Sequence, residues 1–100
     1  MQVAGFEWDA GNWPKCAKHG VTKDEIEEVL TTVRYVVDDP TPGEKRLRTF
    51  GKASTGRYVF VVFTHRERPA GVLIRPISAR YMHRREVAAY EEAMAKLEQR

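Results

Sequence analysis

The chain has 100 residues, of which 42% are hydrophobic and 31% are charged, and its formal net charge at pH 7 is +3. This length is enough for one compact domain with one core and too short for two, so we expect a single domain over residues 1–100. No run of about 18 apolar residues occurs, and the first residues lack a basic segment followed by an apolar one. We therefore expect a cytoplasmic protein with neither a membrane span nor a signal peptide.

The charges are distributed unevenly along the chain. Residues 1–44 hold 4 Lys or Arg against 9 Asp or Glu, residues 45–85 hold 11 against 1, and residues 86–100 hold 2 against 4. The middle block thus carries a net charge of +10, which predicts a polyanionic partner such as a nucleic acid. The less specific alternative is a solvated sheet face on which Lys and Arg protect the edge strands.

The N-terminal part predicts a short edge strand and two helices. Phe6 to Asp9 alternate apolar and acidic residues, as a short strand does. The first helix is expected to begin near Pro14 and to end at Gly20, with Lys18 and His19 in its last turn. These two side chains either interact with the helix terminus or act as a general base and a phosphate contact.

The second helix has the clearest local signal in the chain. Thr22 and Glu25 have the spacing of a capping box, and apolar residues recur at helical spacing from Ile26 to Val33. The acidic residues between them predict a solvated face without metal-site spacing. The single cysteine, Cys16, cannot form an internal disulfide and is interpreted as a buried or half-buried structural thiol rather than a reactive one.

Four strands are expected next, over residues 34–37, 45–51, 57–64 and 72–77, with the third as the central strand. Their turns predict an antiparallel meander. A long helix should follow from Ala79, because His83, Val87, Tyr90, Met94 and Leu97 recur at spacings of 4, 3, 4 and 3. We expect its apolar stripe to pack back on the sheet, which gives an α+β fold with two N-terminal helices and one C-terminal helix.

The junction between the last strand and this helix combines several basic residues with exposed backbone N–H groups, as a phosphate site does. Arg80 and Arg84, four residues apart, are expected on one side of the helix near Arg75, and Arg85 on another side. His83 falls on the apolar stripe, so a packed neutral histidine and a catalytic one are both open. Tyr90 is interpreted as a core residue whose hydroxyl has the junction within reach.

Sequence motifs for nucleotide and zinc chemistry are missing. The chain has no Walker loop, no glycine-rich dinucleotide turn, no GxSxG elbow and no HExxH pair. We therefore expect neither a cofactor nor a metal ion.

Several short motifs follow one another in a fixed order along the chain. They are Phe6-Glu7-Trp8-Asp9, Gly11-Asn12, Lys18-His19-Gly20-Val21, Glu27-Glu28, Gly51 with Gly56-Arg57, Thr64-x-Arg66, and Ile77-Ser78-Ala79-Arg80 followed by Arg85-Glu86 and Tyr90-Glu91. Together these motifs resemble BrnT-type toxins of bacterial type II toxin–antitoxin systems. The resemblance covers nearly the whole chain. Two positions depart from the family pattern, Cys16 in place of a common asparagine and Pro76 in place of a common isoleucine. Pro76 suggests a strand end or edge at the junction.

This resemblance implies a RelE-like fold and a metal-free endoribonuclease that inhibits translation. It also implies neutralisation by a small antitoxin with a DNA-binding domain, in a possible heterotetramer that contacts operator DNA only through the antitoxin. In such chemistry the ribose 2′-hydroxyl attacks the adjacent phosphate, so a base, an acid and cations are required. Arg80 and Arg84 are the candidates for charge stabilisation.

The other candidate residues divide into two groups. The possible proton carriers are His83, His19 and Glu86, with Lys18 beside them, and the sequence does not rank them. The expected RNA contacts are Arg75, Arg85, Arg57, Arg66, Arg48, Lys52 and Tyr90. The alternatives to a ribonuclease are a basic nucleic-acid-binding module without catalysis and a module that binds an antitoxin-like partner.

Overall fold

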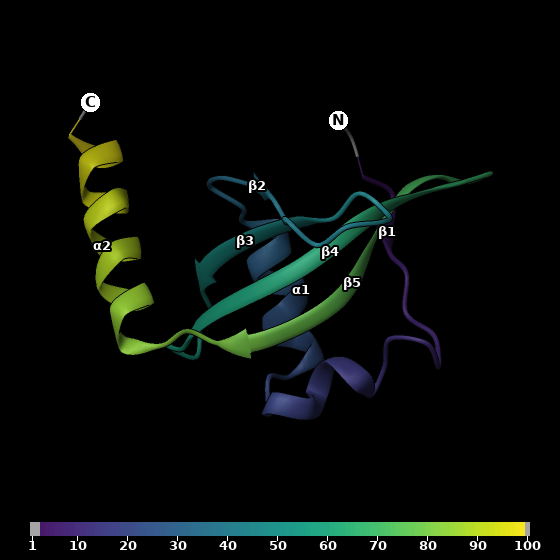
Figure 1. The fold of residues 1–100 in the computed structure, drawn as a ribbon, viewed down its shortest axis with the longest axis horizontal. Coiled ribbons are helices and arrows are strands. Elements are labelled where there is room, and N and C mark those ends of the chain that lie inside the picture. Colours follow the sequence, from purple (N-terminus) through teal and green to yellow (C-terminus); the bar gives the residue numbers. More distant parts are fainter. Residues whose placement is uncertain (1–2, 100) are drawn as a thin grey trace.

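A computed structural model of the protein describes residues 3–99, which form a five-stranded sheet with one α-helix behind it and a second helix beside it (Figure 1). The order along the chain is β1 (Gly5–Phe6), a 3-10 helix η1 (Lys15–His19), α1 (Lys23–Thr31), β2 (Val37–Asp38), β3 (Leu47–Lys52), β4 (Tyr58–Arg68), β5 (Gly71–Tyr81) and α2 (Arg84–Glu98). Within residues 3–99, no helix has the length and apolar character needed to cross a lipid bilayer.

The sheet has the strand order β1-β5-β4-β3-β2. The predicted antiparallel meander is confirmed for β2 to β5, whereas β1 pairs with β5 in parallel, with Gly5 opposite Leu73 and Phe6 opposite Ile74. The expectation of four antiparallel strands is therefore wrong in strand number and in type, since the sheet is mixed. A two-residue strand carries no pattern from which its pairing direction can be predicted.

The capping box that begins α1 is confirmed. The backbone N–H of Glu25 donates to Thr22 Oγ1 over 3.1 Å, and the backbone N–H of Thr22 donates to Glu25 Oε1 over 3.1 Å. Ile26 and Val29 are fully buried, and α1 packs on β3 and β4 across the face of the sheet that is farther from the viewer in Figure 1. At Gly51 a Cβ atom would lie 2.8 Å from Val29 Cγ1, so this glycine permits the close approach of helix and strand.

The other predicted N-terminal helix is shorter than expected. Its limits are confirmed, because η1 follows Pro14 and ends at Gly20, which has the left-handed conformation with φ of 87°. The segment forms a 3-10 helix, so the structure has one N-terminal α-helix where two N-terminal helices were expected. Five residues between these limits leave room for little more than one turn. Cys16 is 1% exposed, as predicted for a structural thiol.

The boundary between β5 and α2 differs from the prediction. The strand continues to Tyr81 and the helix begins at Arg84, so Arg80 is a strand residue paired in register with Phe60. Arg80 and Arg84 therefore do not share a helical side. The prediction failed because a bulge opposite Val62 and Phe63 interrupts the regular pairing in the middle of the strand and hides its continuation.

Pro76 lies inside β5 and not at its end. The pairing of β5 with β1 ends at Ile74, two residues before Pro76. The proline has no N–H to donate, and at this position no strand of the described residues lies beside β5 on the β1 side to accept one. Asn12, which is 2% exposed, covers this position by donating from Nδ2 to the Pro76 carbonyl over 2.9 Å. The edge that the proline suggested is therefore present, five residues before the end of β5.

The existence of the C-terminal helix is confirmed, but its expected packing is not. None of the residues of α2 is buried, and the helix stands beside the sheet, at the left in Figure 1. Its aromatic contact with the sheet is made by Tyr90, whose ring centre lies 5.9 Å from that of Tyr58. His83 is the exposed N-cap residue of α2 and does not belong to a packed stripe. Of the two interpretations left open for His83, the packed neutral histidine is therefore wrong.

The two faces of the sheet have different roles. The core fills the α1 side with residues such as Val59, Val61 and Ala79. Because side chains alternate along a strand, the residues between these positions point to the other side. We call this side the open face; it includes Arg48 and Phe50 of β3, Phe60 and Val62 of β4, and Ser78 and Arg80 of β5.

Candidate functional site

Arg80 lies on the open face, near the end of β5, in a fixed orientation. Its Nη1 donates to Glu86 Oε1 over 2.7 Å, and its Nη2 donates to Glu86 Oε2 over 2.9 Å. Its guanidinium carbon lies 4.4 Å from the centre of the Phe60 ring. A bidentate ion pair and a cation–π contact together hold the plane of the guanidinium group.

Glu86 belongs to the first turn of α2 and connects this helix to the strand. Its Oε1 also accepts a hydrogen bond from the backbone N–H of His83 over 2.8 Å. The Arg80 guanidinium and this N–H lower the pKa of Glu86 to about 2, although partial burial acts in the opposite direction. Glu86 is therefore an anion at neutral pH, and its geometry makes it a residue that positions Arg80.

The connection to α2 gathers further polar and basic side chains. His83 is exposed at the helix N-cap, and Arg84 and Arg85 follow it as exposed residues of the first turn. The positive end of the helix dipole lies at the same place. The structure thus brings three of the predicted residues next to the Arg80–Glu86 pair.

Lys18 and His19 reach the same end of β5 from the α1 side. Both are exposed at the end of η1, next to Gly20. The hydroxyl of Tyr81 lies 3.3 Å from the Gly20 carbonyl and 2.7 Å from Glu25 Oε1. Since Tyr81 and Arg80 are neighbours on a strand, they point to opposite faces of the sheet. The guanidinium carbon of Arg57 lies 4.9 Å from the Tyr81 ring, so it belongs to this second group.

Arg75 does not lie beside Arg80. The two residues are five positions apart along β5, which corresponds to roughly 17 Å. Arg75 donates to Asp9 Oδ2 over 2.8 Å and to Glu7 Oε1 over 3.3 Å. Arg66 forms an ion pair with Glu44 and lies 4.0 Å from Glu7 Oε1, so it joins Arg75 in a separate cluster of ion pairs.

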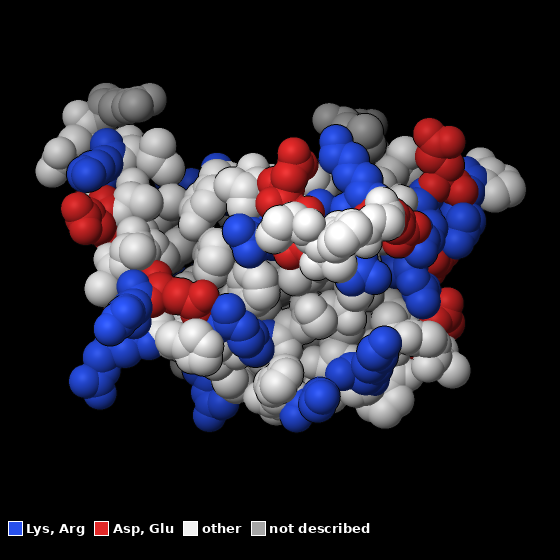
Figure 2. Space-filling view, viewed as in Figure 1, with Lys and Arg blue, Asp and Glu red and all other residues white. Residues whose placement is uncertain are grey.

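Arg48 and Lys52 project from β3. Within residues 3–99 neither side chain forms a salt bridge, and the Nε atom of Arg48 is buried without a hydrogen-bond partner. Lys52 Nζ lies 5.3 Å from the centre of the Tyr58 ring. On the face seen in Figure 2, Lys and Arg side chains surround a central area that is mostly uncharged. This arrangement suits an extended anion that crosses the open face.

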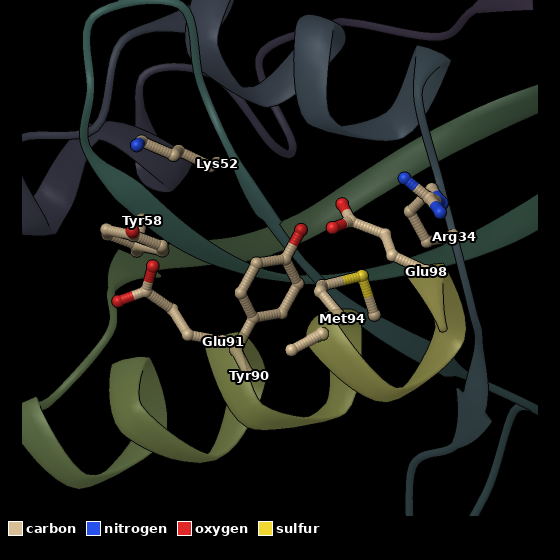
Figure 3. Close-up of a pocket in the computed structure, with 8 residues that line it drawn as sticks. Arg34, Lys52, Tyr58, Tyr90, Glu91, Met94 and Glu98 are labelled. Atoms are coloured by element: carbon tan, nitrogen blue, oxygen red, sulfur yellow. The ribbon is translucent and has the colours of Figure 1, made fainter. Parts of the chain in front are cut away.

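Tyr90 lines a cavity and is not part of the core, contrary to the expectation of a core residue. The cavity, of about 380 Å³, lies between α2 and the sheet. Figure 3 shows the Tyr90 ring in its middle with the hydroxyl directed toward the sheet, Tyr58 and Glu91 on one side and Arg34 and Glu98 on the other.

Sequence reasoning missed Phe60 as a partner of Arg80. The alternation of Tyr58, Phe60 and Val62 could have placed them on one face. Their position opposite Arg80 required the correct end of β5, which the bulge obscured. Glu25 was assigned only to the capping box, although its partner Tyr81 lies 56 residues away.

A search of curated proteins finds no match to this chain. A profile of the family described as the BrnT ribonuclease toxin of type II toxin–antitoxin systems matches residues 8–86, a span that contains η1, α1, all of β2 to β5 and the Arg80–Glu86 pair. The chain therefore belongs to the BrnT family of ribonuclease toxins, whose members are partners of an antitoxin protein.

Proposed function

We propose that this protein is an endoribonuclease toxin that cleaves RNA without a metal ion, by attack of the 2′-hydroxyl on the adjacent phosphate, and thereby inhibits translation. The observation that carries the proposal is the fixed guanidinium of Arg80 at the end of β5, on a face bordered by basic side chains. Preorganised cations of this kind stabilise the charge that develops on a phosphate in the transition state.

The reaction needs no group from outside the protein and RNA. The 2′-oxygen loses its proton to a base and forms a bond to phosphorus, while the bond from phosphorus to the 5′-oxygen breaks. The 5′-oxygen takes a proton from an acid, which leaves a 2′,3′-cyclic phosphate and a 5′-hydroxyl. A guanidinium group has five N–H donors; Glu86 accepts two from Arg80, and the Tyr81 carbonyl accepts a third over 3.4 Å. Arg80 therefore keeps donors for phosphate oxygens without releasing Glu86.

His83 is the proton carrier that the geometry supports best. Its backbone is hydrogen-bonded to Glu86, which anchors the residue beside Arg80, and its side chain is exposed. His19 lies at the same end of β5 on the α1 side and is the second candidate, with Lys18 as a phosphate contact. Glu86 is a weak base at its lowered pKa of about 2, so a positioning role suits it better.

The antitoxin is the expected regulator of this activity. We propose a small antitoxin with a DNA-binding domain, a heterotetramer of two toxins and two antitoxins, and contact with operator DNA through the antitoxin alone. The β2–β5 meander with α1 on one face is compatible with a RelE-like arrangement, in which β1 would be an addition.

The test is cleavage of RNA by purified protein in the presence of EDTA, together with bacterial growth on induced expression. Wild-type protein should cleave RNA to ends with a cyclic phosphate, and Arg80→Ala should lower the rate by about 100-fold or more. Lys96→Ala is the matched control, because it removes an exposed cation at the far end of α2. Equal cleavage by Arg80→Ala, or no cleavage by soluble wild type, would contradict the proposal.

One observation favours a second candidate, a nucleic-acid-binding module without catalysis. The two forked N–H groups of Arg80 are already bound by Glu86, as in a purely structural ion pair. In that case the wild type binds RNA in a salt-dependent manner and leaves it intact, and Arg80→Ala weakens binding only modestly.

A further inference from the structure

A small aromatic pocket adjoins the Arg80–Glu86 pair. It has a volume of about 170 Å³ and is lined by Tyr35, Phe50, Glu86, Ala89 and Tyr90. The sheet side contributes two aromatic residues and α2 contributes the other three. Tyr90 also lines the larger cavity of Figure 3, so the two hollows are neighbours in one cleft between α2 and the sheet.

The rings at the sheet side of this pocket form a continuous series. Tyr35 and Phe50 are stacked, with ring centres 6.2 Å apart and planes inclined by 22°. The ring centres of Phe50 and Phe60 are 4.9 Å apart, and the guanidinium carbon of Arg80 lies 4.4 Å from the centre of the Phe60 ring. A planar group bound against Phe50 would therefore lie one ring away from the residue proposed to hold the reacting phosphate.

The size of the pocket limits what it can hold. A cavity of about 150 Å³ accommodates benzene, whereas sites for drug-sized molecules begin near about 300 Å³. The pocket thus fits a single planar ring system. Aromatic faces stack on any nucleobase, because every base has a π-face.

We propose that this pocket binds one unpaired nucleobase of the RNA, next to the phosphate held by Arg80. The inference rests on the proposed function and adds a substrate class: single-stranded RNA, or a duplex in which one nucleotide is displaced from the stack. The Arg80 cation agrees with this occupant, since it is bound to Glu86 at the edge of the pocket and would lie next to the phosphate of the bound nucleotide. The adjoining cavity is balanced in charge, because it is lined by Arg34 and Lys52 and also by Glu91 and Glu98. An apolar side chain of a protein partner would gain nothing from the Arg80 cation.

Ala89 offers a way to fill the pocket without disturbing its aromatic rings. It is an exposed residue in the middle of α2, so leucine is compatible with the helix there, and its longer side chain would enter the pocket. Ala88→Leu is the matched control. Ala88 is also exposed, lies on the same helix and is not among the residues that line this pocket.

The binding probe is a set of single-stranded 2′-O-methyl RNA oligonucleotides, which lack the attacking hydroxyl, with 2-aminopurine placed at each position in turn. Wild type should quench the fluorescence at one position, where the base stacks on the rings. Ala89→Leu should abolish this quenching and weaken binding about tenfold or more, while Ala88→Leu leaves both unchanged. Tyr35→Leu should reproduce the loss and Tyr35→Phe should restore binding.

Failure of this inference is distinguishable from failure of the proposed function. If wild type binds and cleaves RNA but Ala89→Leu and Tyr35→Leu do so equally well, the pocket does not hold a base and the nuclease proposal remains. If wild type neither binds nor cleaves any RNA, both proposals fail. If the variants lose affinity for the antitoxin and retain RNA binding with quenching unchanged, a protein partner occupies the pocket and the inference is wrong.

Discussion

At the scale of single residues, Glu25 and Asn12 connect parts of the chain that lie far apart in the sequence. Glu25 is 3% exposed and accepts hydrogen bonds from Thr55 Oγ1 over 2.6 Å and from the Tyr81 hydroxyl over 2.7 Å. The Asn12 side chain donates to the Pro76 carbonyl, 64 residues later. The first-turn role of Glu25 was predictable because capping is local. The distant partners were not, since no sequence spacing indicates them.

The ion pair between Arg80 and Glu86 should make the free energy of unfolding depend on pH in the acid range. The pKa of Glu86 is lowered from 4.5 to about 2 in the folded protein, so ionisation of this carboxyl stabilises the fold above about pH 4.5. The stabilisation is lost as the pH falls from 4.5 toward 2. Since both side chains are partly exposed, Glu86→Gln should lower the free energy of unfolding by about 1 kcal/mol at pH 7.

Urea denaturation of the wild type and Glu86→Gln at several pH values between 7 and 2 measures this difference. The difference should be constant down to about pH 4.5 and should shrink below it. Glu92→Gln is the control, because Glu92 is exposed and, among the described residues 3–99, its ion pair is the exposed one with Lys96 at 3.5 Å. A difference that does not change down to pH 2 would show that the carboxylate form contributes no stability.

At the scale of elements, the sequence predicted α1 and the meander well and the attachment of α2 poorly. Helical spacing in α1 coincides with burial, because Ile26, Val29 and Leu30 face the core. The same spacing in α2 accompanies no buried residue. Periodicity shows that a helix has an apolar side, but it does not show what lies opposite that side. The direction in which α2 leaves the sheet depends on the end of β5, which was placed four residues too early.

The contact between α1 and β3 predicts a stability effect at Gly51. An added Cβ atom would lie 2.8 Å from Val29 Cγ1, and both residues are buried. Gly51→Ala should therefore force the helix away from the strand and destabilise the protein by about 1–3 kcal/mol, which denaturant unfolding measures.

A double variant provides the control for this clash. Val29→Ala removes the atoms that the new Cβ would meet, so Gly51→Ala combined with Val29→Ala should cost less than the sum of the two single changes. If the two effects simply add, the packing of these residues is not the reason for the glycine.

At the scale of the whole molecule, the sequence predicted the family, the α+β class and the basic character of the central block. It did not predict that much of this charge is already paired. Arg66, Arg75 and Arg80 each bind a carboxylate from outside the basic block, drawn from Glu44, Glu7, Asp9 and Glu86. The net charge of a segment therefore overstates the number of cations that are available to a phosphate backbone.

Substitution of Arg48 would show whether a cation on β3 that has no ion-pair partner among the described residues contacts the RNA backbone. Its Nε atom is buried without a hydrogen-bond partner, and it forms no salt bridge within residues 3–99, so it is free to neutralise one phosphate. Each phosphate neutralised on a single strand contributes about −0.7 to the slope of log K against log salt concentration. Arg48→Gln should weaken RNA binding for all sequences and reduce this slope by about 0.7.

The measurement is fluorescence anisotropy with 2′-O-methyl RNA at salt concentrations from about 50 to 200 mM. Lys96→Gln, on the far end of α2, should leave the slope unchanged. An unchanged slope for Arg48→Gln would mean that RNA does not cross the sheet at β3. The path would then run along the end of β5, where Arg80 and the exposed residues Arg84 and Arg85 lie, and Arg85→Gln would be the variant that reduces the slope.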